Sequence, residues 1–450
     1  MKKIFQYIML AVVTIVMASC TSDIEETTAT TGKSNVQLVV GEFPAFGDSQ
    51  TRAIGTPDEG KTSWAEGDEL LLEIDNTFYG KQYATFTYNG KSWELTSGEL
   101  VYLEGDPAYI SHVYYAPNYK WEAGKLVLKE GKDPGTDEYI EGNARITGNG
   151  ETITVSFAEA TRKYSRLRIA TLPNEQITVD TEYFTPAGSS DMEQEGNYTL
   201  TSDEKGNAYL YGTFENNSEV TVKYREAALT THTFSQATES AKSYALDATV
   251  ISANSAEEIK SAIEQKVADG KTTIRLNLAP NAGTNEFMAI REAIKGAAPN
   301  DLGTIELTII GVETIPEEAF YKMLQLKSVR MSDVKEIKKY AFKECQYLTV
   351  VEAPSLNKLC SGAFKKCDQL AKLTFGPINY ADERNWPIFE YITPNIDLIL
   401  SDYQKEMIET DDDLYTANND IDYALSPEHV SKNFLGHEFK SITCRRYRVE

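Results

Sequence analysis

The strongest constraint on the fold of this 450-residue chain is a repeat of 22 residues in its C-terminal half. The pair Ala319-Phe320 recurs as Ala341-Phe342 and again as Ala363-Phe364. Other apolar residues keep the same spacing around each pair, namely Ile315, Ile337 and Leu359, then Leu326, Leu348 and Leu370, then Val329, Val351 and Leu373. A period of about 20–29 residues with this pattern is typical of a leucine-rich solenoid with one strand per repeat. The period therefore predicts stacked coils over residues 311–376, with the phenylalanines and leucines in one continuous core.

The middle copy carries the most specific motif of the repeat. From Ile337 to Val351 it has the form Ile-x₃-Ala-Phe-x₂-Cys-x₂-Leu-x₂-Val. This form resembles the BspA-like leucine-rich repeats of bacterial surface proteins, with Met323 in place of the cysteine in the first copy. The resemblance implies a surface adhesin that binds host matrix proteins or other bacteria.

The residues on both sides of the repeat are expected to cap it, because a solenoid of few coils exposes its core at both ends. Residues 253–310 begin with a capping box formed by Ser255 and Glu258, and Gly270 ends the helix that follows. A second helix is predicted from about Glu286 to Lys295, with strands over Ile274–Leu278 and Ile305–Ile309. Residues 377–450 are assigned to the C-terminal cap, with strands over Ile396–Leu400 and Phe439–Arg446.

The chain from Val36 to about Ser252 has the pattern of short strands and shows no convincing helical period. Ala84, Phe86 and Tyr88 alternate, and Asn89-Gly90 follows at once. Asn-Gly supplies two residues that accept positive φ, which predicts a tight hairpin turn. Because so many short strands cannot share one layer, we expect two packed β-sandwich units over residues 35–156 and 157–252.

Four segments of this region resemble the fimbrillin-like domains. They are Arg52 followed by Trp64–Asp68, then Val113–Pro117 and Ser243–Asp247. From the residues alone, Gly67-Asp68 is a turn before a strand and Trp64 is a core residue. The resemblance implies a two-domain β-sandwich that is often lipid-anchored and assembles into pili by strand exchange after cleavage at an arginine. Arg52 is the matching candidate for that proteolytic processing, although this chain continues where a pilin would end.

The first residues have the features of a secretory signal. Lys2 and Lys3 precede a short apolar stretch from Ile8 to Val16, which is too short to span a bilayer. The run Met17–Cys20 resembles the bacterial lipobox, which implies cleavage after residue 19 and a lipid on the sulfur of Cys20. The alternative is an ordinary signal peptide with an incidental cysteine.

Residues 20–34 are polar and are expected to form an acidic tether. The patch Ser22–Glu26 resembles the export signal that carries some lipoproteins to the cell surface, and the alternative is a plain solvated linker. We therefore expect an outer-membrane protein that is anchored by lipid and exposed on the cell surface.

The formal net charge of −24 limits the class of partner. Removal of residues 1–19 takes away two lysines and no acid, which changes the charge to −26. Nucleic acid and anionic membranes require a basic surface. We therefore expect no nucleic-acid partner and no polyanionic ligand.

Catalytic and metal-binding motifs are missing from the sequence. The chain has no Gly-x-Ser-x-Gly, no His-Glu-x-x-His, no phosphate-binding glycine loop and no Cys-x₂-Cys pair. Cys345 and Cys367 occupy the same repeat position, and we expect buried thiols there, with a disulfide as the alternative. The acidic run near Asp411–Asp413 and His429 allows a calcium site, but its spacing fails the EF-hand pattern. We expect neither an enzyme nor a cofactor.

The repeat offers a candidate binding face, because side chains alternate between the core and the outside along each strand. The outward positions are Ser328, Arg330, Val350, Glu352, Lys372 and Thr374. The fold class we predict is a mostly β multidomain protein, with two fimbrillin-like β-sandwich units followed by a short leucine-rich-repeat solenoid with α+β caps. Its expected function is adhesion to a host or bacterial surface protein or glycan. The alternatives are a pilus anchor, tip or accessory subunit, and a lipoprotein that captures glycans.

Overall fold

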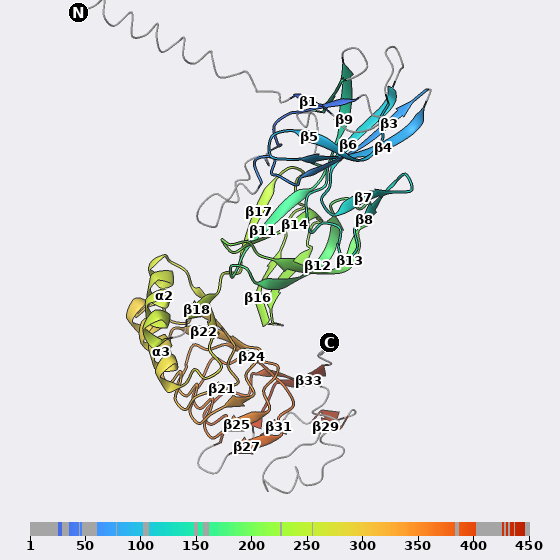
Figure 1. The fold of residues 1–450 in the computed structure, drawn as a ribbon. Coiled ribbons are helices and arrows are strands. Elements are labelled where there is room, and N and C mark those ends of the chain that lie inside the picture. Colours follow the sequence, from blue (N-terminus) through green and yellow to red (C-terminus); the bar gives the residue numbers. More distant parts are fainter. Residues whose placement is uncertain are drawn as a thin grey trace, which may run out of the picture. The chain divides into compact units, whose positions relative to one another are not determined.

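The computed structural model describes two compact units of a mostly β chain (Figure 1). The described residues are 36–44, 46, 61–77, 79–101, 108–147, 152–155, 162–225, 227–253, 255–382 and 387–401, with short strands at 26–28 and between 425 and 445. Unit 1 comprises Met1–Val222 and Thr230–Ala248. Unit 2 comprises Lys223–Leu229 and Thr249–Glu450. All statements below concern the described residues.

The N-terminal region of unit 1 forms an eight-stranded sheet in the order β1-β2-β10-β9-β6-β3-β4-β5. Its strands are β1 (Glu26–Thr28), β2 (Gln37–Val40), β3 (Glu69–Asn76), β4 (Gly80–Tyr88), β5 (Trp93–Gly98), β6 (Ala108–Tyr115), β9 (Ile140–Thr147) and β10 (Thr152–Val155). Alternate apolar side chains such as Leu72, Phe86 and Val113 are buried in one core, as the period of two along a strand requires. A separate hairpin joins β7 (Tyr119–Glu122) to β8 (Lys125–Leu128).

The predicted hairpin between β4 and β5 is present, but its turn differs from the expectation. Tyr88 pairs with Trp93, so four residues form the loop instead of two. Gly90 has a φ of +88°, whereas Asn89 keeps an ordinary negative φ. The Asn89 side chain instead accepts hydrogen bonds from the backbone N–H groups of Lys91 and Ser92 at 2.9 and 2.8 Å. The prediction of two positive-φ residues was wrong because an asparagine side chain can close a longer turn by itself.

The second region of unit 1 has its own sheet in the order β16-β15-β12-β14-β11-β17, and β13 pairs with β12. Its strands are β11 (Ser165–Ala170), β12 (Gln176–Pro186), β13 (Glu193–Thr201), β14 (Asn207–Phe214), β15 (Glu219–Tyr224), β16 (Ala227–Thr233) and β17 (Ser243–Asp247). Phe184 and Phe214 pack in its core with ring centroids 4.5 Å apart. The sheets thus change between β10 and β11. The packing of each sheet into a β-sandwich stays a prediction.

Unit 2 is built on a parallel sheet of eight strands in the order β18-β19-β20-β22-β24-β26-β28-β33. These strands are β18 (Ile251–Ala253), β19 (Thr273–Leu278), β20 (Ile305–Ile310), β22 (Leu326–Met331), β24 (Val350–Ala353), β26 (Lys372–Phe375), β28 (Asp397–Ser401) and β33 (Ser441–Arg445). A second parallel sheet contains β21 (Thr314–Ile315), β23 (Glu336–Ile337), β25 (Lys358–Cys360) and β27 (Tyr380–Asp382). Two small hairpins, β29 (Leu425–Ser426) with β30 (His429–Val430) and β31 (Asn433–Phe434) with β32 (His437–Glu438), complete the strands.

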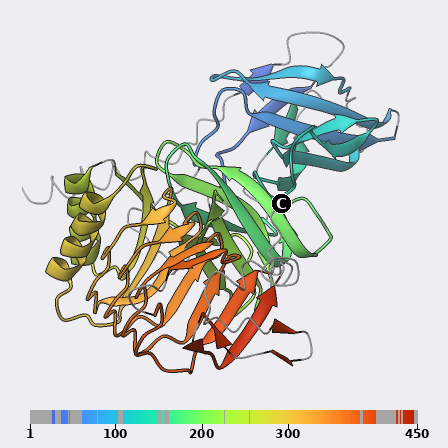
Figure 2. The ribbon, with the colours of Figure 1, turned by 90° about the horizontal axis from the view of Figure 1, so that it is seen from below.

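The two predicted helices connect the first strands of this sheet. Helix α2 (Ala256–Ala268) begins at Ser255, whose hydroxyl accepts from the backbone N–H of Glu258, and buries Ile259 and Ile263. Helix α3 (Thr284–Ala297) buries Phe287, Ile290 and Ile294, as its period predicts. Because β18, β19 and β20 are parallel, residues 253–310 form the first coils of the same stack. Figure 2 shows the strands following one another from α2 and α3 at one end to β33 at the other.

The phenylalanines of the repeat lie one above the other. The ring centroids of Phe320 and Phe342 are 5.1 Å apart, and those of Phe342 and Phe364 are 5.4 Å apart with an interplanar angle of 6°. All three side chains are fully buried. Phe287 of α3 packs edge-on against Phe320 at 5.7 Å, which continues the core into the helical coils. The aligned ladder that the 22-residue period predicts is therefore present.

The stack also continues beyond the predicted boundary at residue 376. Phe389 lies parallel to Phe364 with centroids 5.8 Å apart, although 25 residues instead of 22 separate the two. The backbone N–H of Phe364 donates to the carbonyl of Ile388, which takes the place of the repeat alanine. Strands β27 and β28 supply the pairing of this coil. Residues 377–382 and 387–401 thus belong to a further coil whose spacing hides it from the repeat pattern.

Candidate binding surface

The six residues of the predicted binding face lie in two rows on neighbouring strands of the large sheet of unit 2. One row contains Ser328, Val350 and Lys372, which pair in register across β22, β24 and β26. The other row contains Arg330, Glu352 and Thr374. The parallel register, repeated every 22 residues, places chemically different side chains side by side at regular intervals. We call this set the sheet face.

Only the central part of the sheet face is accessible. Ser328 and Thr374 are each 7% exposed, whereas Arg330, Val350, Glu352 and Lys372 are half-buried. Glu352 accepts from Arg330 at 3.0 Å and lies 3.6 Å from the ammonium group of Lys372. One carboxylate therefore compensates two cations, and the sheet face presents a web of paired charges without a free one.

The row of Arg330 continues onto β19 and β20, where its residues are more deeply buried. Thr308, which pairs with Arg330, is 3% exposed, and Arg275, which pairs with Thr308, is 6% exposed. The Arg275 side chain donates to the carbonyl of Leu229, in the short segment that groups with unit 2. Ligand access to the sheet face is thus limited to its middle coils.

The two repeat cysteines are buried free thiols. Cys345 donates from Sγ to the carbonyl of Phe320, and Cys367 donates to the carbonyl of Phe342, each at 3.0 Å. Burial raises the pKa of the Cys345 thiol to about 12 and raises that of Cys367 well above its ordinary value. Protonated thiols of this kind are poor nucleophiles and poor metal ligands. The disulfide alternative is not formed.

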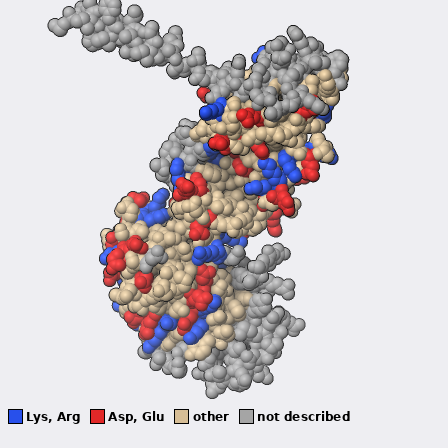
Figure 3. Space-filling model, viewed as in Figure 1, with Lys and Arg blue, Asp and Glu red and all other residues tan. Residues whose placement is uncertain are grey.

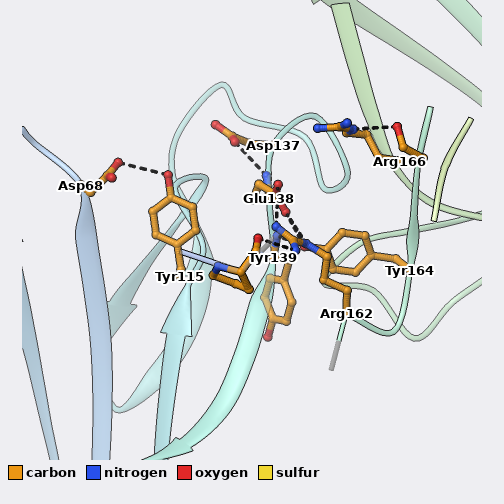
Figure 4. Close-up of polar contacts among 10 residues, drawn as sticks. Asp68, Tyr115, Asp137, Glu138, Tyr139, Arg162, Tyr164 and Arg166 are labelled. Carbon is orange, nitrogen blue, oxygen red and sulfur yellow. Dashed lines mark hydrogen bonds and ion pairs between the residues drawn. The ribbon is translucent and has the colours of Figure 1, made fainter. Parts of the chain in front are cut away.

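The turn around Asp68 and the end of β6 meet in unit 1. The Asp68 carboxylate accepts from the backbone N–H of Ala65 at 2.8 Å and from the Tyr115 hydroxyl at 3.1 Å (Figure 4). The Trp64 ring packs edge-on against Tyr115 and Trp93, with centroids 5.3 and 5.1 Å away. Burial, followed by the nearby Asp68 charge, raises the pKa of Tyr115 far above its ordinary value. These residues join a turn to two strands, which is a structural role.

A buried ion pair in unit 1 escaped the sequence analysis. The guanidinium of Arg162 donates to both carboxylate oxygens of Glu138 at 3.3 and 3.2 Å, and each side chain is 3% exposed (Figure 4). The hydroxyl of Tyr164 donates to the same carboxylate at 2.7 Å. Arg162 also donates to the carbonyl of Pro44 and stacks over the Phe46 ring, 3.9 Å from its centroid. These contacts tie the residues before β11 to the first sheet.

Several predicted sites lie outside the described residues. They are Cys20 in the lipobox, Arg52 at the predicted cleavage position and the acidic run Asp411–Asp413. Among the residues that are described, no group of three or more His, Cys, Asp or Glu side chains is arranged to hold a metal ion. No helix within them is long and apolar enough to cross a membrane.

The family comparison concerns unit 2. Residues 301–394 match the BspA type leucine rich repeat region in six copies. This span starts in the helical coils and includes the coil around Phe389. A solved structure of a candidate cell adhesion protein from Bacteroides fragilis is similar over 51% of this chain and 93% of its own, at 10% identity and a TM-score of 0.26. A search of curated proteins gives no match. The BspA-type repeat is consistent with a surface adhesion or binding role.

Proposed function

We propose that this protein is a surface lipoprotein that binds a protein or glycan partner through the leucine-rich solenoid of unit 2, without catalysis. The observation that carries the proposal is the continuous stack from Phe287 to Phe389. A stack of this kind holds side chains at fixed intervals before a ligand arrives, so binding loses little conformational entropy. Repeat proteins commonly use such extended surfaces for recognition. The match of residues 301–394 to BspA-type repeats supports the same role.

Attachment to the outer membrane is the second part of the proposal. A signal segment over residues 1–19 and an acylated Cys20 would place unit 1 next to the lipid and leave unit 2 free to meet a partner. Each buried CH₂ of an acyl chain contributes about 0.8 kcal/mol, so several chains hold a protein in a membrane without a spanning helix. Unit 1 would then act as a fimbrillin-like spacer.

Binding is tested with the soluble chain that starts at residue 21. It is probed on an array of extracellular-matrix proteins, bacterial surface proteins and glycans, and we expect saturable binding to at least one class. Replacement of Arg330 and Lys372 by glutamine removes both cations of the sheet face, and the control Lys129→Gln removes one paired cation of unit 1. Absence of any ligand for the unchanged chain would contradict the proposed function. If the sheet-face variant bound as tightly as the unchanged chain, the sheet face would be excluded as the binding surface, but the proposed function would stand.

Anchoring is tested in cells that express the full chain. We expect the unchanged protein to incorporate a labelled fatty acid and to fractionate with the outer membrane, and Cys20→Ala to lose both properties. Protease added to intact cells should degrade the anchored protein if it is exposed. Incorporation of lipid by Cys20→Ala would refute the assignment.

A further inference from the structure

The turns that face away from the sheet of unit 2 form a second regular surface. They connect the short strands to the long ones in each coil and include residues 316–325, 338–349 and 361–371. Their backbones are hydrogen-bonded from coil to coil. The backbone N–H groups of Phe320, Phe342 and Glu344 donate to the backbone carbonyls of Ala341, Ala363 and Lys365, at 2.7, 2.9 and 2.8 Å respectively. We call this surface the turn edge. Its backbone is therefore fixed by hydrogen bonds from one coil to the next.

The repeat region that contains the turn edge has an unusual charge for this protein. Residues 311–376 contain eleven Lys or Arg and eight Asp or Glu, a net charge of +3 in a chain whose total is −24. Lysines on other faces of the stack are paired with acids of the next coil, for example Lys335 with Glu313 and Lys358 with Glu336. Figure 3 shows this mixture of signs on the face of unit 2 toward the viewer. A total charge therefore does not describe each surface, because fields act over about 8–10 Å in salt solution.

Three lysines of the turn edge have no acidic partner within the described residues. They are Lys338, Lys339 and Lys366, none of which forms an ion pair with a described acid. Lys338 and Lys366 are exposed. A fourth, Lys343, lies 4.0 Å from Glu344, at the limit of an ion pair, and Glu344 is also 3.5 Å from Lys322. The middle coils thus carry exposed lysines that form no ion pair with a described acid, although the same turns also contain exposed acids such as Glu318 and Asp368.

The Tyr340 ring lies beside two of the turn-edge lysines, Lys339 and Lys343. Tyr340 has a φ of +58°, a left-handed backbone conformation that costs about 1–3 kcal/mol for a residue other than glycine. One coil further on, the same position is Gly362, also left-handed. A Cβ on Gly362 would lie only 2.5 Å from Cε1 of Tyr340, so the ring rests directly on the glycine. The ammonium groups of Lys339 and Lys343 lie 4.8 and 4.7 Å from its centroid.

We propose that the turn edge around Tyr340 binds the carboxylated or sulfated sugars of an anionic glycan. Ammonium groups pair with the acidic substituents, and the tyrosine supplies a flat contact for the sugar ring. This inference rests on the proposed function and assigns its ligand class. It also revises the expectation, drawn from total charge, that a polyanionic ligand is excluded.

A folded protein partner fits this surface less well. The cores of protein interfaces are apolar and depleted in lysine. The exposed or half-buried side chains of the turn edge are mainly lysine, glutamate, glutamine and tyrosine, and Leu324 is the partly exposed leucine among them. Such a surface offers charge and tyrosine rings but no apolar centre. A hydrated, flexible, acidic polymer can use it without one.

The experiment uses the soluble chain from residue 21 and four immobilised polymers. Heparin supplies sulfated sugars, polygalacturonate supplies carboxylated sugars, dextran is neutral, and polyglutamate is an acidic polypeptide. We expect binding to one or both anionic glycans that weakens with salt, because exposed charge pairs are screened. Binding to heparin alone identifies sulfate as the recognised group, and binding to polygalacturonate alone identifies carboxylate. The proposal would be overturned if dextran were bound as tightly as heparin and polygalacturonate, or if polyglutamate were bound more tightly than these two glycans.

Two variants locate the site. Replacement of Lys338, Lys339 and Lys366 by glutamine should weaken glycan binding by about tenfold or more, equivalent to about 1.4 kcal/mol. Tyr340→Gly removes the ring at a position where glycine is favoured, so the fold should be kept while binding weakens several-fold. Tyr340→Phe should retain most of the affinity.

The matched control replaces Lys327, Lys335 and Lys358, which are paired lysines of the same stack, by glutamine. It changes the net charge by the same amount and should bind nearly as well as the unchanged chain. Equal loss in the control and the turn-edge variant would show nonspecific attraction and overturn the proposal. If the unchanged chain binds array ligands but the turn-edge variants bind them equally well, the inference fails and the proposed function stands. If the unchanged chain binds nothing, the proposed function itself fails.

Discussion

The cores of the two units are stabilised in different ways. In the stack of unit 2, the same residue types recur in register. Phe342 contacts Phe320 and Phe364, and the buried Leu348 is the middle copy of a repeated leucine position. In unit 1, a buried ion pair between Glu138 and Arg162 joins segments that share no repeat. The first core is apolar and periodic, whereas the second contains a polar contact that occurs once. Loss of one residue should therefore act differently in each unit.

Phe342→Ala is expected to have the largest effect on stability. The side chain is fully buried between two parallel rings, and its removal leaves a cavity that the backbone ladders on both sides keep from collapsing. Truncation of a buried phenylalanine costs about 3–5 kcal/mol. Denaturant unfolding followed by circular dichroism and by site-specific probes should show an early transition of unit 2 and an unchanged transition of unit 1. The control Tyr391→Ala truncates a ring that is 68% exposed and should change little. Simultaneous loss of both units would contradict the comparison.

Glu138→Gln tests the polar contact of unit 1. It leaves the Arg162 charge buried without a counter-charge, and breaking a buried pair from one side costs about 3 kcal/mol. The double variant Glu138→Leu with Arg162→Met removes both charges and should recover much of this loss. The unfolding free energies of the two variants and of the unchanged chain provide the comparison. If the double variant were less stable than Glu138→Gln, the unpaired charge of Arg162 would not be the cause of the stability loss in Glu138→Gln.

The same contrast explains how much could be predicted from the sequence. The ladder of Phe320, Phe342 and Phe364 was predictable because a fixed period forces equivalent residues into contact. The coil of Phe389 was hidden by three additional residues, although Ile388-Phe389 is an apolar pair like Ala363-Phe364 and was the available signal. The pairing of Glu138 with Arg162 was not predictable, because any of 68 acidic residues could have faced that arginine.

The candidate surfaces divide in the same way. Strand alternation separates the six sheet-face residues from the core residues between them, since side chains along a strand alternate by geometry alone, and the strand register then arranges them in two rows. Alternation cannot show that Ser328 and Thr374 are nearly inaccessible, because that depends on residues distant in the sequence. The turn edge was missed because Lys338, Lys339 and Lys366 occupy three different repeat positions, so the period does not single them out. Their lack of an acidic partner depends on how the coils stack, which the sequence alone does not show.

Cys345→Ala sharpens the comparison within unit 2 by a smaller deletion. The thiol fills the space beneath the Phe320 carbonyl and donates to it, so its loss should cost about 1 kcal/mol. Cys360 is only half-buried, and Cys360→Ala should therefore be close to neutral. In the unchanged chain, the raised pKa of Cys345 predicts that a thiol reagent labels it only as unit 2 unfolds. Rapid labelling of Cys345 in the native protein would show that this part of the stack opens independently.

The smallest expected effect concerns pH, and it lies at the C-terminal end of the stack. His437 packs against Phe389 and Phe439 with ring centroids 5.6 and 4.9 Å away, and its Nε2 is buried without a hydrogen-bond partner among the described residues. Burial lowers its pKa below the ordinary value of 6.5. As the pH falls, the imidazole of His437 is protonated in the unfolded chain before it is protonated in the folded chain. The contribution of neutral His437 to folding stability is therefore fully present above pH 6.5 and is lost as the pH falls toward the folded pKa.

His437→Phe removes this proton while keeping an aromatic ring of similar size. We expect the denaturant midpoint of unit 2 to fall between about pH 7 and pH 5 in the unchanged chain, and to fall less in the variant. The titration of Asp397 does not overlap with this pH window. Hydrogen bonds from Ser441 and Lys440 lower its pKa below the ordinary value of 3.8, so the stability that it contributes is lost only below about pH 4. Identical pH profiles for the two proteins would show that the final coil does not exclude the proton. The periodic core would then end before His437, and the stack would be shorter than its backbone pairing indicates.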